Sequence, residues 1–109
     1  HGFIASASQR AKGDGGLFNE ITHVDYDSGK VQTWDAGVGN GVSEPVFVEK
    51  GPNSLEGDGW LLATIYTAKT ATSSLVILDA QAVSDGPVAT ARLDHRVPYG
   101  FHGSWRPNR

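Results

Sequence analysis

The residue whose setting most favours metal chemistry is His102. It lies between Gly100 and Gly103 and among three aromatic residues, in the segment VPYGFHGSW at 97–105. Glycine lets the backbone approach another group closely, and the aromatic rings are expected to exclude water from the imidazole, a common metal ligand. The alternative is a histidine packed in a turn and satisfied by a backbone carbonyl. One histidine alone does not make a site.

Glu44 is the second candidate because its carboxylate precedes an apolar run, residues 45–48 (PVFV). Burying a carboxylate is costly unless it meets a cation or a hydrogen-bond donor. A glutamate commonly accepts a hydrogen bond from the outer nitrogen of a metal-bound imidazole, which fixes the tautomer and orientation of that ring. Glu44 therefore suits the support of a metal-ligating histidine, and an exposed position at a strand edge is the alternative.

The other histidines do not complete a metal-binding set. His23 lies in a hairpin pattern, His95 in a polar stretch and His1 at the first position, so each is expected on the surface or within a sheet. The glycine-rich residues 37–41 lack the flanking strand and helix of a phosphate-binding loop. The sequence also lacks the Gly-x-Ser-x-Gly motif of a serine hydrolase.

Short runs of β-favouring residues, separated by turns rich in glycine and aspartate, predict an all-β fold for the elements that hold these side chains. No segment shows sustained helical periodicity. The pattern predicts a strand end and loop at 4–16, a hairpin with strands at 18–26 and 31–34, a loop at 36–43, and further strands beginning at 44 and at 60–67, 75–80 and 88–93.

The strand at 60–67 has apolar side chains on both faces, which is typical of a central strand buried on both sides. Residues 44–93 therefore predict one antiparallel meander of four strands, about the ~40–50 residues of a propeller blade. The hairpin at 18–34 would then be the outer half of the preceding blade. Because a propeller needs roughly four to eight blades to close, this chain cannot close one alone. A four-strand sandwich is the alternative.

Composition excludes several classes of protein. The 109 residues are 39 % apolar and 19 % charged, typical of a soluble folded chain, with no apolar run near the ~20 residues of a spanning helix. The net charge of −3 provides no basic field for nucleic acid. The absence of cysteine excludes disulfides and thiolate metal sites, and the cytoplasm is the favoured compartment. Because methionine is absent, we expect the chain to be part of a longer protein.

Four blocks of the sequence resemble, in order and spacing, the C-terminal end of the carotenoid cleavage oxygenases. That family includes the stilbene-cleaving dioxygenases and the retinal-pigment-epithelium retinoid isomerase. The blocks are residues 43–48 (SEPVFV), 58–62 (DGWLL), 75–80 (LVILDA) and 98–103 (PYGFHG). Residues 29–30 and 34–35 fit the penultimate hairpin of the family moderately, and residues 1–16 fit it loosely.

The resemblance implies a seven-bladed β-propeller with a non-haem Fe(II) on its axis, held by four histidines and supported by glutamates. His102 matches the last iron ligand and Glu44 its partner, while the other three ligands have no matching position here. The implied divisions are a single C-terminal fragment at 1–109, the outer hairpin of the penultimate blade at 17–35, the last blade at 44–93, and a segment returning to the axis at 97–105.

The resemblance also implies a function. The parent enzyme is expected to cleave a conjugated C=C bond of a carotenoid, apocarotenoid or stilbene-like substrate with O2, giving two carbonyl products, and the fragment without the N-terminal blades is expected to be inactive. Peripheral membrane contact of the parent is left open. An iron-dependent isomerase on the same scaffold is one alternative. A non-enzymatic propeller that grips sugars through Trp34, Trp60 or Trp105 is the other.

Overall fold

The computed structural model describes residues 1–8, 17–98 and 100–108, and within them the chain is built from β-strands. The remaining residues, 9–16 of the predicted loop at 4–16, Tyr99 of the 98–103 block and Arg109, lie outside the described part. In the described part, no helix is long and apolar enough to cross a membrane. The elements are β1 (Gly2–Ser6), β2 (Glu20–Val24), β3 (Val31–Asp35), β4 (Gly41–Val42), β5 (Val46–Glu49), β6 (Gly59–Thr67), β7 (Thr72–Asp79), the 3₁₀ turn η2 (Val83–Asp85) and β8 (Pro87–Arg92).

The first sheet has the order β1-β2-β3 with antiparallel pairing throughout. Its β2–β3 hairpin confirms the hairpin predicted at 18–34, although β2 is shorter than the predicted strand. Asp25 closes the turn, because its carboxylate accepts hydrogen bonds from the Asp27 N–H (3.0 Å) and the Ser28 hydroxyl (2.8 Å). Such side-chain acceptors are the reason that aspartate and serine favour turns.

The second sheet has the order β4-β6-β7-β8, and β5 also pairs with β6. Strands β5 to β8 pair successively and antiparallel, which confirms the four-strand meander predicted at 44–93. The loop predicted at 36–43 is partly wrong, because the two residues of β4 pair with Tyr66 and Ile65 of β6. A strand of two residues is too short to show the alternation that identifies strands in a sequence.

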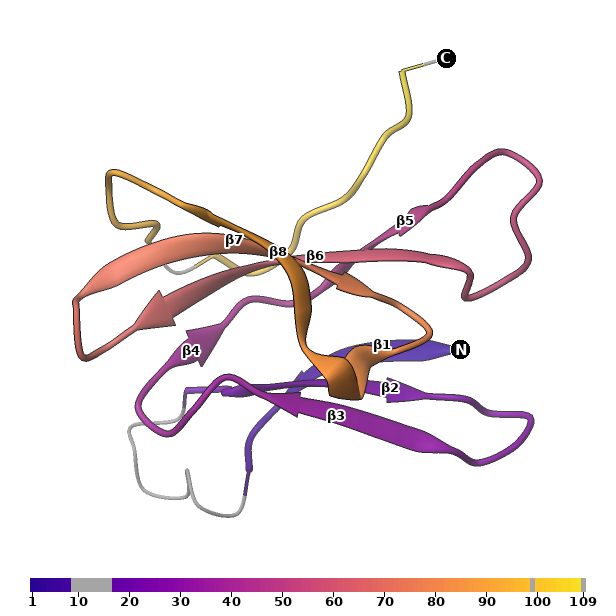
Figure 1. Ribbon diagram of the computed structural model, residues 1–109, viewed down its shortest axis with the longest axis horizontal. Coiled ribbons are helices and arrows are strands. Elements are labelled where there is room, and N and C mark those ends of the chain that lie inside the picture. Colours follow the sequence, from indigo (N-terminus) through magenta and orange to yellow (C-terminus); the bar gives the residue numbers. More distant parts are fainter. Residues whose placement is uncertain (9–16, 99, 109) are drawn as a thin grey trace.

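The two sheets lie as two layers (Figure 1), and one hydrophobic core joins them. Ile21 of β2 is fully buried together with Leu61 of β6 and Leu78 of β7. The other buried members of this core are Val42, Ala63, Ile65, Val76, Ala80 and Val83. The core thus lies between the sheets and leaves the opposite face of the second sheet for other contacts.

Strand β6 is central, as predicted, but only one of its faces is fully buried. The face that bears Leu61 and Ala63 belongs to the core, whereas Leu62 and Thr64 on the opposite face are half-buried. The expectation of burial on both sides is therefore wrong for this second face. The reason is that it is covered only in part, by the segment that follows β8.

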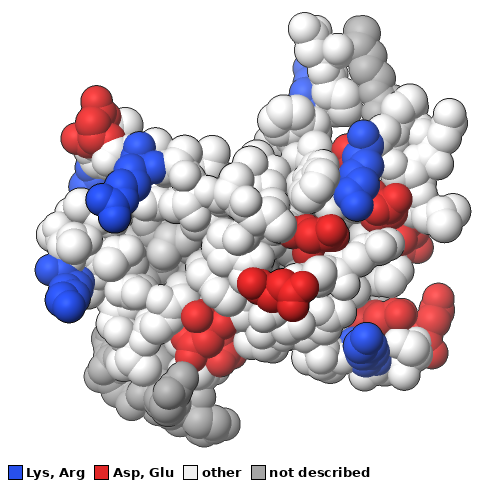
Figure 2. Space-filling view, in the orientation of Figure 1, with Lys and Arg blue, Asp and Glu red and all other residues white. Residues whose placement is uncertain are grey.

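The surface carries charges of both signs. On the face drawn in Figure 2, Lys and Arg side chains lie among acidic ones and form no continuous basic surface over the described residues shown. Opposite charges also meet in an ion pair between Lys50 Nζ and Asp58 Oδ1, at 3.1 Å.

Candidate functional site

Glu44 lies at a break in the pairing along one edge of β6. Strands β4 and β5 pair with different parts of β6, and Pro45 has no N–H with which to continue the ladder between them. Ser43 bridges the gap: its N–H donates to the Thr64 carbonyl (2.9 Å), and its hydroxyl accepts the Thr64 N–H (2.8 Å). The backbone beside Glu44 is therefore fixed to β6, while the Glu44 side chain is half exposed.

His102 lies in the irregular segment that follows β8 and passes back across the second sheet (Figure 1). Ser73 of β7 holds the start of this segment. Its carbonyl accepts the Leu93 N–H (3.0 Å), and its hydroxyl accepts the Val97 N–H (2.9 Å). The segment therefore has a fixed origin on β7, a few residues before His102.

The structure brings the two predicted site residues together. His102 Nδ1 lies 2.5 Å from Glu44 Oε2, although 58 residues separate them in sequence. Since an ionised carboxylate can only accept, the imidazole donates from Nδ1, and in the neutral tautomer with this bond Nε2 is the nitrogen that has the lone pair. Within the described residues Nε2 makes no hydrogen bond. This geometry replaces the alternative in which a backbone carbonyl satisfies His102, and it gives the half-exposed Glu44 a partner.

The aromatic neighbours of His102 do not exclude water from it, contrary to the expectation from the sequence. The His102 side chain is 84 % exposed, and Phe101 and Trp105 are 90 % and 52 % exposed. Residues 100–108 form no helix or strand, and the Phe101, His102 and Trp105 side chains are exposed along them. Proximity in sequence therefore did not bury the imidazole of His102 beneath Phe101 or Trp105.

Two adjoining cavities border the His102–Glu44 pair. The first has a volume of about 480 Å³ and lies between the first sheet, β6 and the segment that carries His102. Its lining is mainly apolar and includes Ile4, Phe18, Val42, Ile65, Val97 and Phe101, together with Tyr66 and Arg96. The second, about 300 Å³, follows the same segment to Trp105. His102 thus borders space that suits an apolar molecule.

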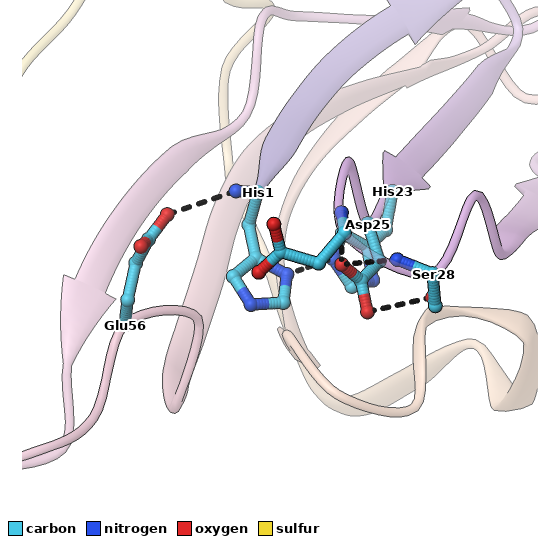
Figure 3. Close-up of polar contacts among 6 residues, drawn as sticks. His1, His23, Asp25, Ser28 and Glu56 are labelled. Carbon is cyan, nitrogen blue, oxygen red and sulfur yellow. Dashed lines mark hydrogen bonds and ion pairs between the residues drawn. The ribbon is translucent and has the colours of Figure 1, made fainter.

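The other histidines lie elsewhere, and His1 and His23 form a pair of their own (Figure 3). His1 Nδ1 and His23 Nε2 are 2.8 Å apart, so one donates to the other. His23 is buried in β2 and stacked on Phe3, and burial lowers its pKa below the ordinary value. Two nitrogens in direct hydrogen bond leave no space for a metal between them. Across the described ranges, no three or more His, Asp or Glu side chains are grouped so as to hold a metal ion.

Among the described residues, His95 forms a second contact between an imidazole and a carboxylate. Its Nδ1 lies 2.8 Å from Asp94 Oδ1, but both side chains are highly exposed and the residues are sequence neighbours. This contact is local and borders neither cavity, so it is a surface pair, as the sequence predicted for His95.

Two serines of the site were missed by sequence reasoning. Ser43 and Ser73 each offer a hydroxyl to a backbone N–H that has no strand partner. Ser43 belongs to the family-like block 43–48, so its place beside Glu44 and Pro45 could have indicated a role at the site. Ser73 carries no such signal, because Ser73 and Ser74 look alike in sequence and only the structure shows which one is buried.

Comparisons with known proteins show which proteins this chain resembles. The sequence model of the retinal pigment epithelial membrane protein family matches residues 1–107. The chain is 38 % identical over 96 residues to lignostilbene-α,β-dioxygenase isozyme III of Sphingomonas paucimobilis, covering 88 % of the chain and 20 % of that protein. It is 42 % identical over 85 residues to apocarotenoid-15,15′-oxygenase of Synechocystis, covering 78 % and 17 %.

Solved structures show the same similarity. The chain matches the crystal structure of a lignostilbene dioxygenase of Pseudomonas brassicacearum with a TM-score of 0.86 and 28 % identity, covering 96 % of the chain and 23 % of that structure. It matches cobalt-substituted apocarotenoid oxygenase of Synechocystis with a TM-score of 0.77 and 40 % identity, covering 84 % and 19 %. The chain thus spans about one fifth of the length of these relatives, and the expected fold class, about two blades of their propeller, is confirmed. On sequence and structure together, the chain belongs to the retinal pigment epithelial membrane protein family, that of the carotenoid oxygenases.

Proposed function

We propose that this chain is the C-terminal part of a non-haem Fe(II) dioxygenase that cleaves a conjugated C=C bond. In this proposal residues 17–35 are the outer hairpin of the penultimate blade, 44–93 form the last blade, and 97–105 return to the axis. The N-terminal blades supply the other three histidines, so the 109 residues alone are inactive. A cytoplasmic location, with or without peripheral membrane contact, remains a prediction.

The contact between His102 and Glu44 carries the proposal. A carboxylate that accepts from Nδ1 fixes the neutral tautomer in which Nε2 has a lone pair, and it raises the basicity of that nitrogen. An exposed Nε2 fits a metal ion whose remaining ligands come from other parts of a protein. Borderline metals such as Fe(II) accept imidazole ligands, so the donor set is chemically suitable.

Bound iron would supply the site at which O2 is activated for addition across the conjugated bond. The part of this chain is to hold one ligand in the correct tautomer and orientation. Glu44 keeps the proton on Nδ1, and its charge offsets part of the charge of the metal without joining the ligands. The mainly apolar cavity that His102 borders favours a lipophilic molecule over water.

The names of the relatives support a polyene or stilbene-like substrate. They include a lignostilbene dioxygenase, an apocarotenoid oxygenase and a carotenoid 9,10(9′,10′)-cleavage dioxygenase. Each such substrate has a conjugated C=C bond in a flat, apolar framework. The mainly apolar lining of the cavity of about 480 Å³ suits such a framework. Cleavage consumes O2, whereas isomerisation on the same scaffold does not, so O2 uptake separates these two reactions.

The test is His102→Ala in the full-length enzyme, with His95→Ala as the matched control. We expect His102→Ala to abolish iron retention, measured by elemental analysis, and cleavage, measured by O2 uptake with a stilbene or apocarotenoid. His95→Ala should leave both unchanged, because His95 is a surface residue outside the cavities. Full activity and iron content in His102→Ala would refute the ligand assignment.

A further inference from the structure

The segment that carries His102 has no strand partner to hold it. After β8 ends at Arg92, the described residues up to 108 form no helix or strand. An irregular segment is expected to sample many conformations unless side-chain hydrogen bonds restrict it. The position of His102 against Glu44 therefore needs an attachment other than a sheet ladder.

Ser73 provides this attachment. It is the residue of β7 that pairs with Tyr66 of β6, and it is only 2 % exposed. Its carbonyl and hydroxyl bind the N–H groups of Leu93 and Val97, so one residue fixes two points of the segment four residues apart. The Ser73 hydroxyl thereby takes the place of the missing strand partner.

A cation–π contact beside Ser73 attaches the same segment to the sheet. The Arg96 guanidinium lies over the Tyr66 ring, 5.0 Å from its centroid, a distance typical of a cation–π contact. Because Tyr66 and Ser73 are register partners, the two attachments meet side by side on β6 and β7. Residues 96 and 97 are thus held from both strands.

We propose that Ser73 is a positioning residue for His102, with Arg96 on Tyr66 as the second attachment. Val97 is five residues before His102, so a shift at Val97 changes where the imidazole meets Glu44 and any metal at Nε2. Removing the Ser73 hydroxyl would leave the Val97 N–H without its partner and release the segment. The inference rests on the proposed function only in its consequence for the metal.

The experiment compares Ser73→Ala with Ser74→Ala in the full-length enzyme. Ser74 is the matched control because it is the same residue type one position along β7, on the opposite face. In Ser73→Ala we expect hydrogen exchange over residues 93–103 to quicken about 3- to 10-fold, as for the loss of one hydrogen bond. We also expect iron to dissociate about 3- to 10-fold more readily, while Ser74→Ala behaves as wild type.

Two results with Ser73→Ala would overturn the inference. One is unchanged exchange over 93–103 in Ser73→Ala, which would mean that the hydroxyl does not hold the segment. The other is quickened exchange with unchanged iron dissociation, which would make Ser73 a structural residue without a positioning role. Should Ser73→Ala not fold, the exposed Arg96→Gln is expected to quicken exchange over the same residues, and wild-type exchange there would overturn the inference too.

Failure of the proposed function gives a different result. If the wild-type enzyme retains no iron, the proposed function is wrong, and the ¹⁵N NMR signals of histidine-labelled enzyme decide the inference alone. The Nδ1–H signal of His102 reports its hydrogen bond to Glu44. A weaker bond in Ser73→Ala than in Ser74→Ala would support positioning by Ser73, and equal signals would exclude it.

Discussion

Replacing Glu44 by glutamine tests the support of His102 with the smallest change of shape. The amide keeps an oxygen that can accept from Nδ1 but removes the negative charge. Hydrogen bonds to charged groups contribute about 1.5–3 kcal/mol and neutral ones about 0.5–1.5 kcal/mol. The expected loss from the change of charge is therefore about 1–1.5 kcal/mol, before any allowance for solvent.

Because both side chains are exposed, we expect a free-energy loss at the lower end of this range. Glu44 is 49 % and His102 84 % exposed, and water weakens interactions between exposed charged groups. A loss of about 1 kcal/mol corresponds to roughly a five-fold weaker affinity for iron. Glu44→Ala, which removes the acceptor completely, is expected to weaken iron binding by about 10- to 100-fold. Cleavage should fall in the same order, with iron partly retained in Glu44→Gln.

The assay is the iron dissociation constant of the full-length enzyme, measured by competition with a chelator. Asp94→Asn is the matched control, since it makes the same change of acid to amide in the contact between Asp94 and His95. We expect this variant to bind iron as the wild type does. Equal iron affinity in wild type, Glu44→Gln and Glu44→Ala would refute the support of the ligand by Glu44.

Two further predictions concern the stability of the chain. A Cβ at Gly59 would lie 2.6 Å from the Phe47 ring and closer still to the Val48 carbonyl oxygen. Gly59→Ala should therefore lower the free energy of unfolding by about 2–3 kcal/mol. In the control Gly51→Ala the new Cβ meets no atom within 4 Å, so the free energy of unfolding should change by less than about 0.5 kcal/mol. Denaturant titration measures both, and equal midpoints would contradict the expected overlap. Burial lowers the pKa of His23, so the unfolded chain binds a proton more readily and the free energy of unfolding should decrease as the pH falls below about 6.5. His23→Gln should weaken this dependence of stability on pH, whereas the surface variant His95→Gln should not. Thermal unfolding at several pH values measures the dependence. An unchanged dependence in His23→Gln would contradict the role given to His23.

The sheets were largely predictable from the sequence because their signals are local. Alternating apolar residues and aspartate–serine turns are properties of short segments, so the hairpin at 18–34 and the meander at 44–93 follow from them. β4 was missed because its two residues show no alternation, and their pairing depends on a distant part of β6. The second face of β6 was assigned too much burial, since sequence shows that a face is apolar and does not show what covers it.

The site was predictable in its residue types and less so in its surroundings. The resemblance pointed to His102 and Glu44, and the structure places them in contact. Exposure of the imidazole was not predictable, because it depends on which segments lie over it and those are remote in sequence. The role of Ser73 was likewise hidden, since a buried hydroxyl that accepts a backbone N–H looks like any strand serine.

The attraction between His102 and Glu44 is not what brings them together. Exposed ion pairs contribute about 0–1 kcal/mol, whereas ordering the backbone of one residue costs about 1–2 kcal/mol. A pair as exposed as this one therefore cannot by itself order the four residues between Val97 and His102. The Ser43 hydroxyl attaches the chain beside Glu44 to β6, and the Ser73 hydroxyl in β7 attaches Val97, five residues before His102. The two backbone segments are thereby held on adjacent strands, which keeps Glu44 and His102 close. In the proposed enzyme, further blades that cover the pair would remove water and strengthen that bond, so the serines set the geometry and burial would set its strength.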